Sequence, residues 1–294
     1  MPYLTHGKNP DMFGSHLSIA GGMHHALLDA QRLGMDCVQI FTKNQRQWNV
    51  PPLLDEQIDT WRKAMTQTGI TQVVSHDSYL INLASPKAET RDKSIALFVH
   101  ELERCEKLKI PYLVTHPGAH MKAGEEEGLD RVAQALDQLH EELPDLSVLT
   151  CLEVTAGQGT ALGYTFEHLA TIIEKTHANH RLGVCLDTAH LIAAGYDLTS
   201  AAGAKEVIEQ CDHILGLNRV KVLHINDSKI PRGKRVDRHT HIGHGHVSLD
   251  AFEIIVNTPA FQNIPKILET PKEDAPDGRP WDTINLETLR NLMH

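Results

Sequence analysis

Residues 222–246 read VLHINDSKIPRGKRVDRHTHIGHGH, a short apolar run followed by a loop rich in basic residues and histidines. Three of the first four residues are apolar and predict a buried β-strand, with His224 inside the run. In the loop, Asp237 and His239 are two residues apart, so they point the same way in an extended segment. They can then reach one metal ion while neighbouring arginines face an anion, which suggests metal-assisted chemistry on a phosphate. Taken alone, the stretch is equally compatible with a solvated, histidine-rich loop.

The composition excludes several classes of protein. The 294 residues are 41% hydrophobic and 22% charged, which provides a sizeable core and argues against disorder. The N-terminus has no apolar signal sequence, and no apolar run approaches the ~18 residues of a membrane-spanning helix. The five cysteines are scattered and odd in number, which is typical of reduced core thiols rather than a disulfide framework. We therefore expect a cytoplasmic protein that does not bind membranes.

The net charge of −10 argues at first sight against a nucleic-acid partner. However, the chain contains 20 histidines, and neutral histidine is the commonest metal ligand. Bound divalent ions would offset part of the negative charge, so the mouth of a metal site can differ in sign from the whole chain. The net charge therefore does not exclude a substrate that contains phosphate.

Eight apolar, β-rich runs alternate with eight helical patterns along the chain. We expect strands at residues 13–19, 37–42, 72–75, 111–115, 147–152, 182–186, 220–225 and 265–268. We expect helices at residues 26–33, 55–68, 88–108, 125–142, 166–176, 201–215, 249–257 and 281–293. This alternation predicts a (β/α)8 (TIM) barrel of the α/β class. No linker divides the chain, so we expect one domain over residues 1–294, with residues 1–12 as an N-terminal extension.

Side chains that can bind a metal ion stand at the ends of six predicted strands. From the third strand onward, these residues are His76, His116, Glu153, Asp187, His224 and Glu269. A single strand-end histidine is more often a satisfied core residue. Barrel geometry, however, brings the C-terminal ends of all strands to one cavity, where active sites of this fold lie. The sequence therefore predicts a metal site at this end of the barrel.

Three further candidates lie in the loops beside these strand ends. His190 is in the loop after Asp187, and Asp237 and His239 follow the seventh strand. Zinc takes about four nitrogen, oxygen or sulfur ligands, and none of the cysteines holds a strand-end position. Nine ligands suffice for three ions if one carboxylate bridges two of them. Glu153 stands between the two groups in strand order and is the natural bridge, although residue types alone do not exclude a two-ion site.

Ten short segments carry a more specific signal. They read GSHLSIAGG (14–22), FTKNQRQW (41–48), HDSYLINL (76–83), HPGAH (116–120), TAGQG (155–159), DTAH (187–190), AGYD (194–197), HINDSK (224–229), VDRH (236–239) and LET (268–270). Together they span about residues 13–270, and in them the chain resembles endonuclease IV, the family of zinc-dependent apurinic/apyrimidinic endonucleases. Two positions depart from the family pattern: Val154 stands where asparagine is expected, and His244 where glutamate is usual.

The resemblance implies three zinc ions per chain, with manganese an alternative at one position. One ion would be held by His76, His116 and Glu153. The second would be held by Glu153, Asp187, His224 and Glu269. The third would be held by His190, Asp237 and His239. Glu153 would also be catalytic, because it would orient the hydroxide that attacks phosphorus.

The resemblance further implies a DNA-repair endonuclease acting on double-stranded DNA that contains abasic sites. It would hydrolyse the phosphodiester 5′ to the lesion and leave a 3′-hydroxyl and a 5′-deoxyribose phosphate. Arg46, Tyr79 and Leu80 would enter the DNA at the lesion, as an apolar wedge and a cation can. The basic loop would contact phosphates through Lys229, Arg235 and Arg238, and we expect a monomer.

Two alternatives remain open from the sequence. A divalent-metal sugar isomerase on the same barrel also uses strand-end carboxylates and histidines, but it has little use for a basic loop. A non-catalytic lesion-binding protein would use the metal only for structure. The isomerase should not incise DNA, and the binding protein should bind abasic DNA without incising it.

Overall fold

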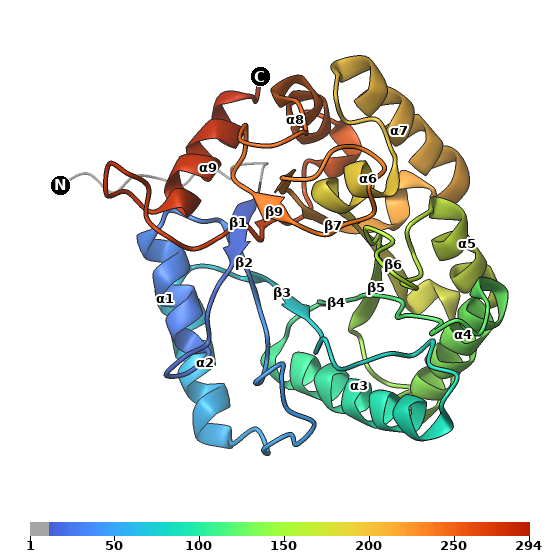
Figure 1. The fold of residues 1–294 in the computed structure, drawn as a ribbon. Coiled ribbons are helices and arrows are strands. Elements are labelled where there is room, and N and C mark those ends of the chain that lie inside the picture. The colour runs from blue at the N-terminus through green and yellow to red at the C-terminus, as the bar shows by residue number, and fades with distance from the viewer. Residues whose placement is uncertain (1–11) are drawn as a thin grey trace.

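Eight parallel strands close into a barrel in the order β1-β10-β7-β6-β5-β4-β3-β2 (Figure 1). The computed structural model describes residues 12–294, so the predicted N-terminal extension lies outside the described residues except for Met12. The barrel strands are β1 Phe13–His16, β2 Cys37–Ile40, β3 Gln72–His76, β4 Tyr112–Thr115, β5 Leu149–Glu153, β6 Leu182–Asp187, β7 Val220–His224 and β10 Lys266–Leu268. The predicted (β/α)8 architecture is confirmed.

Helices form the outer ring around these strands (Figure 1). They are α1 His24–Arg32, α2 Asp55–Thr68, α3 Ala88–Leu108, α4 Glu125–Glu142, α5 Phe166–Lys175, α7 Ala201–Leu215, α8 Leu249–Val256 and α9 Trp281–Asn291. Three short 3-10 helices, η1 Asn179–Arg181, η2 Leu217–Arg219 and η3 Pro259–Phe261, lie in the connections. Within residues 12–294, no helix combines the length and the apolar character needed to cross a membrane.

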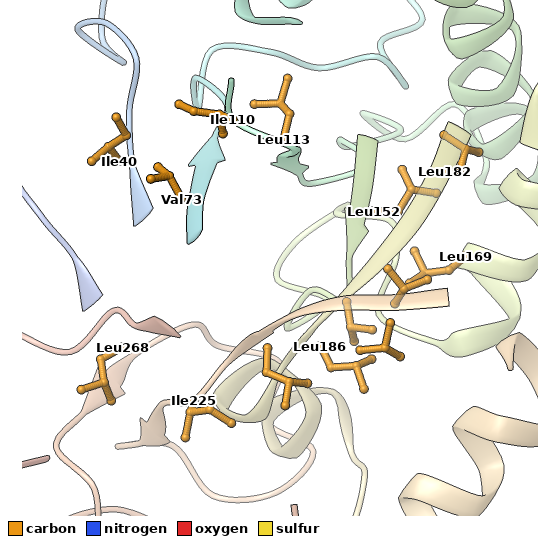
Figure 2. Close-up of a cluster of buried hydrophobic side chains, with 14 of the residues drawn as sticks. Ile40, Val73, Ile110, Leu113, Leu152, Leu169, Leu182, Leu186, Ile225 and Leu268 are labelled. Atoms are coloured by element: carbon orange, nitrogen blue, oxygen red, sulfur yellow. The ribbon is translucent and has the colours of Figure 1, made fainter. Parts of the chain in front are cut away.

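Side chains alternate between the two faces of each strand, which gives the barrel two cores. Val73 and Leu113 point outward into the large cluster between strands and helices (Figure 2). Their neighbours Val74 and Val114 belong to a smaller cluster inside the barrel. All five cysteines are buried and free, and Cys185 lies in this inner cluster. Apolar side chains thus fill the inside of the barrel below the strand ends, so a site for a ligand is left at the C-terminal ends of the strands.

A short helix and a two-stranded sheet at the open end were not predicted. Helix α6, Thr188–Ala194, begins directly after β6, so His190 lies on a helix and its predicted place in a loop is wrong. The Asp187 side chain caps this helix by accepting a hydrogen bond from the His190 backbone N–H at 2.8 Å. Strands β8, Asp227–Ser228, and β9, His239–Thr240, pair antiparallel across the basic loop. Both elements are too short to leave a periodic pattern in the sequence.

Candidate metal centre

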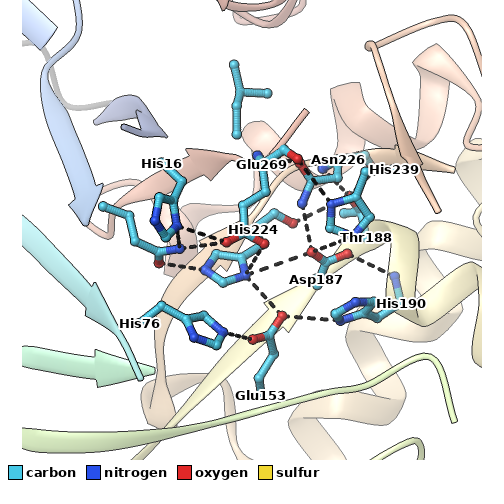
Figure 3. Close-up of polar contacts among 12 residues, drawn as sticks. His16, His76, Glu153, Asp187, Thr188, His190, His224, Asn226, His239 and Glu269 are labelled. Carbon is cyan, nitrogen blue, oxygen red and sulfur yellow. Dashed lines mark hydrogen bonds and ion pairs between the residues drawn. The ribbon is translucent and has the colours of Figure 1, made fainter. Parts of the chain in front are cut away.

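The nine predicted ligands converge at the C-terminal end of the barrel, as Figure 3 shows for seven of them. Asp187 and His224 are partners in the register of β6 and β7, whereas Glu153 is paired with Cys185, two residues before Asp187. A cavity of about 690 Å³ opens above them. Its lining includes His76, His116 and Glu269. The barrel therefore places these donors at the floor and walls of one concave site.

The first group consists of His76, His116 and Glu153. The Nε2 atoms of both histidines lie 3.2 Å from Glu153 Oε2. One donor atom from each residue lies within 4.8 Å of the others, as a shared ion requires. The other ring nitrogen of His76 lies 2.9 Å from the carbonyl oxygen of Asp77, which orients the imidazole.

The second group uses the other oxygen of the same glutamate. Glu153 Oε1 lies 3.0 Å from His224 Nδ1, which also faces Glu269 Oε2 at 3.3 Å and Asp187 Oδ2 at 3.8 Å. The Glu153, Asp187 and His224 side chains are all buried. Glu153 thus belongs to both groups, one through each carboxylate oxygen, in keeping with the bridge expected from strand order.

The third group surrounds His190 and His239. Asp237 lies between them, with Oδ2 3.2 Å from His190 Nε2 and Oδ1 3.1 Å from His239 Nε2. Asp187 Oδ2 also approaches His239 Nε2, at 3.7 Å. One donor atom from each of Asp187, His190 and His239 lies within 4.8 Å of the others. Asp187 therefore belongs to both the second and the third group. The sequence did not indicate this sharing.

The short distances between these histidines and carboxylates shift their pKa values toward the charged forms. Burial lowers the pKa of His76, but the hydrogen bond and charge of Glu153, together with the charges of Asp77 and Glu269, raise that pKa to about 10. Asp187 is the main charge that raises the pKa of His239 to about 9 against the effect of burial. Burial would raise the pKa of Glu153, but His224 and His116 hold it well below its usual range. A metal ion would compete with the protons on these imidazoles.

The donor set fits zinc. Imidazole nitrogens and carboxylate oxygens are ligands that zinc accepts. His239 Nε2 is buried and lies 3.1 Å from Asp237 Oδ1 without the geometry of a hydrogen bond, as expected of a nitrogen that would bind a metal ion. Cys185 lies close to Glu153 and His224 but faces the barrel interior, and burial raises its thiol pKa well above the usual value.

The residues predicted to contact DNA lie in the segments that follow β2, β3 and β7, at the same end of the barrel, and Tyr79 also lines the cavity. Tyr79 is 64% exposed and meets Phe41 edge-on, with ring centroids 5.5 Å apart. Arg46 is exposed in the loop after β2, whereas Leu80 is half-buried and packs against the core. Tyr79 is thus available at the mouth, and Leu80 is available only in part.

The lysine and arginine side chains of the basic loop differ in the contacts that they make. Lys229, Arg235 and Arg238 are exposed. The Arg235 guanidinium lies over the Tyr164 ring, 4.2 Å from its centroid. Arg232 instead pairs with Asp197 at 2.8 Å. Arg232 is therefore partly neutralised, while the three predicted contact residues remain open to an anion.

Sequence reasoning missed two buried amides that hold the ligands. Asn226 donates to Asp187 Oδ2 at 2.7 Å and accepts from the Glu269 backbone N–H at 2.6 Å. Gln39 contacts both His224 and Glu269. The signal in the sequence is a polar residue inside or directly after an apolar strand, but an amide side chain is not a typical zinc ligand.

The two departures from the family pattern leave the ligand groups intact. His190 Nδ1 lies 2.9 Å from the carbonyl oxygen of Val154, so this contact uses the backbone and not the side chain. The Val154 side chain is buried in the hydrophobic core. His244 is exposed and contacts Trp281 edge-on, at 5.1 Å between centroids, outside the three groups.

A buried ion pair supports the loop that carries Arg46. Lys43 Nζ lies 3.4 Å from Glu101 Oε1 on α3, and both side chains are almost fully buried. The same ammonium donates to the carbonyls of Asn44 and Gln47 at 3.2 Å. The pair therefore fixes the path of the loop from beneath.

Glu101→Leu should lower the free energy of unfolding by about 3–5 kcal/mol, because it leaves the Lys43 ammonium buried without its partner. Urea unfolding measures this loss. The matched control is Glu89→Leu, which breaks an exposed pair with Lys93 on the same helix and should cost at most about 1 kcal/mol. An unfolding midpoint for Glu101→Leu equal to that of the control would show that the pair does not stabilise the fold.

Known proteins resemble the chain over nearly its whole length. The family described as xylose isomerase-like TIM barrel matches residues 27–292. A Chloroflexus aurantiacus protein named probable endonuclease 4 is 50% identical over 282 residues, covering 96% of this chain and 98% of that protein. The structure of endonuclease IV from Thermus thermophilus superimposes with a TM-score of 0.83 at 34% identity, covering 96% of this chain and 98% of that one. A D-tagatose 3-epimerase-like protein matches with a TM-score of 0.73, 96% coverage of both chains and 19% identity, which indicates a common fold only.

Proposed function

This chain belongs to the endonuclease IV family, and we propose that it is a DNA-repair endonuclease that incises double-stranded DNA at abasic sites. Hydrolysis would break the phosphodiester 5′ to the lesion, leaving a 3′-hydroxyl and a 5′-deoxyribose phosphate. The observation that carries this proposal is the arrangement of nine nitrogen and oxygen donors in three adjoining groups, with Glu153 common to two of them. A site built this way suits charge stabilisation on a phosphate better than proton transfer on a sugar.

We infer that the three groups hold three zinc ions, with manganese an alternative at one position. When bound, the ions supply Lewis-acid stabilisation of the phosphate charge and lower the pKa of water. The protein would hold the nitrogen and oxygen donors in place around the ions. Glu153 would orient the attacking water, and Asp187, which belongs to the second and the third group, would hold ions in both. No side chain needs to act as the nucleophile.

The cavity above the donors would receive the lesion. An abasic nucleotide has no base to pair or stack, so turning it out of the duplex costs least at that point. Tyr79 would fill the space left in the stack, with Leu80 beside it. Phosphate contacts would come from four cations, Arg46, Lys229, Arg235 and Arg238. Their attraction for phosphates would offset the repulsion between DNA and a protein of net negative charge. One chain carries all these parts, in keeping with action as a monomer.

Incision of a duplex with one abasic site, beside an undamaged duplex of the same sequence, tests this function. We expect cleavage of the damaged strand alone, with a product that ends in a 3′-hydroxyl. Incubation with D-tagatose tests the sugar-isomerase alternative, and a binding assay under the same conditions tests the lesion-binding alternative. Epimerisation without incision, or binding without incision, would overturn the proposal.

Salt dependence should separate the phosphate contacts from the wedge. Arg238→Ala should weaken DNA binding and flatten the plot of log affinity against log salt by about 0.9, because one counterion-releasing contact is lost. Tyr79→Ala should cost about 1–3 kcal/mol of abasic-site binding through lost stacking and leave the slope unchanged. Fluorescence titrations at several salt concentrations measure both quantities.

Two controls make this comparison decisive. Arg32 lies at the end of α1 that leads into β2, so it is on the far side of the barrel, and Arg32→Ala should change neither quantity. Zinc content and melting temperature of Tyr79→Ala test whether Tyr79 merely packs beside His76, with ring centroids 5.6 Å apart. A Tyr79→Ala protein with full zinc, unchanged melting and unchanged affinity would remove the wedge role.

A further inference from the structure

Gln39 is the single polar residue in the strand Cys-Val-Gln-Ile of β2, and its side chain is completely buried. Its amide makes three contacts at the floor of the cavity. The Nε2 atom lies 2.7 Å from Glu269 Oε1 and 2.9 Å from His16 Nδ1, and the Oε1 atom lies 2.8 Å from His224 Nε2. A buried amide with all these partners is a built feature of the site.

The partners fix the orientation of the amide. A carboxylate only accepts hydrogen bonds, so the atom facing Glu269 is the amide nitrogen. The amide oxygen must then face His224, and because this oxygen only accepts, His224 Nε2 must carry a proton and donate it. The second amide hydrogen is directed at His16 Nδ1. The chain of donors and acceptors therefore runs in one direction from His224 to Glu269 and His16.

The orientation of the Gln39 amide decides which atoms of His224 and Glu269 remain available to a metal ion in the second group. With its proton on Nε2, His224 keeps Nδ1 toward Glu153 and Asp187, at 3.0 and 3.8 Å from their carboxylate oxygens. Glu269 has Oε1 held by Gln39, which leaves Oε2 facing His224 Nδ1 at 3.3 Å. The amide of Gln39 on β2 thus orients two predicted ligands, His224 at the end of β7 and Glu269 directly after β10, both of which are labelled in Figure 3.

We propose that Gln39 is the positioning residue of the second metal position, where it fixes the tautomer of His224 and the orientation of the Glu269 carboxylate. The inference rests on the proposed function, because it concerns the ion that this group would hold. Gln39 is completely buried and is not one of the nine donors, so it would act through His224 and Glu269. Loss of such an outer hydrogen bond weakens metal binding by about 10–100-fold, and one ion should be affected while the others are not.

Zinc release from the full-length, zinc-loaded protein tests the proposal. Gln39→Met replaces the amide by an apolar side chain of similar volume, and Gln39→Asn keeps an amide that is one methylene too short. Both variants should lose one of about three ions about 10–100 times more readily to a chromogenic chelator. The matched control is Gln72→Met, at the opposite end of the barrel on β3, and it should release zinc like the wild type.

The ¹⁵N shifts of the His224 ring provide a readout that packing alone would not move. The wild type should show a protonated Nε2 and a metal-bound Nδ1, and Gln39→Met should lose or shift this signature. Melting temperatures of the zinc-loaded proteins show whether each variant folds. Should Gln39→Met be unfolded, Gln39→Asn carries the test.

The outcomes separate this inference from the function on which it rests. If the wild type binds zinc and incises abasic DNA, but both variants match its zinc release and His224 shifts, the positioning role is overturned and the function stands. If the wild type neither binds zinc nor incises, the proposed function fails and the inference fails with it.

Discussion

Glu153→Gln should lower the rate of incision at abasic sites by at least about 10³-fold while the barrel stays folded, because several kcal/mol of charge stabilisation are lost. The substitution keeps the size of the side chain and removes the charge that faces both the first and the second group. Glutamine keeps one oxygen, and its NH2 group cannot bind a metal ion, so one of the two groups loses the oxygen that Glu153 presents to it. Single-turnover incision at saturating enzyme measures the effect.

Zinc content and a matched variant complete this test. The zinc count of Glu153→Gln should fall below that of the wild type. Glu89→Gln, an exposed glutamate on α3, should retain full rate and full zinc. A Glu153→Gln protein that incises at near wild-type rate would show that this carboxylate does not link the two groups.

Asp187→Asn should also reduce incision by about 10³-fold or more, for a different structural reason. Asp187 Oδ2 faces His224 and His239, so its charge serves the second and the third group. Its other oxygen caps α6 through the backbone N–H of His190. Asparagine is an equally good helix cap, so Asp187→Asn should remove the charge and leave the helix in place.

Comparison with Asp187→Ala separates the two roles. Alanine also removes the cap and should cost about 1 kcal/mol more in unfolding free energy than asparagine. Ser200→Asn exchanges one capping residue for another on α7, away from the metal groups, and should change neither rate nor zinc content. Full zinc and full rate in Asp187→Asn would exclude Asp187 from the metal centre.

The fold could be predicted because most elements of the barrel are long enough for their hydrophobic periodicity to show in the sequence. Helices α2, α3, α4 and α7 begin and end at the predicted residues, since each covers several turns with a regular apolar face. Helix α6 has seven residues, nearly all buried, and starts where a strand ends, so no polar face marks it. The first two strands end earlier than predicted, at His16 and Ile40, because the chain leaves the ladder while it is still apolar.

The metal centre could be predicted as far as topology dictates it. Strand ends of a barrel must meet, which places His76, Glu153 and Glu269 in one site without knowledge of any loop. Asp187 is shared between two groups because the basic loop brings His239 close to it. The sequence of this loop has no periodicity from which its path could be predicted. Gln39 has no metal-ligand chemistry, so only its contacts in three dimensions identify its role.

Zinc titration of metal-free protein, with incision measured on the same samples, tests most directly the claim that three linked ions cleave abasic DNA. Elemental analysis of the active protein should give about three divalent ions per chain, mainly zinc, because nine donors with shared carboxylates suit three sites of about four ligands. Incision of the abasic duplex should stay near zero through the first equivalents and appear as the third is added. Full activity at one or two equivalents, or with the metal-free protein, would contradict the account.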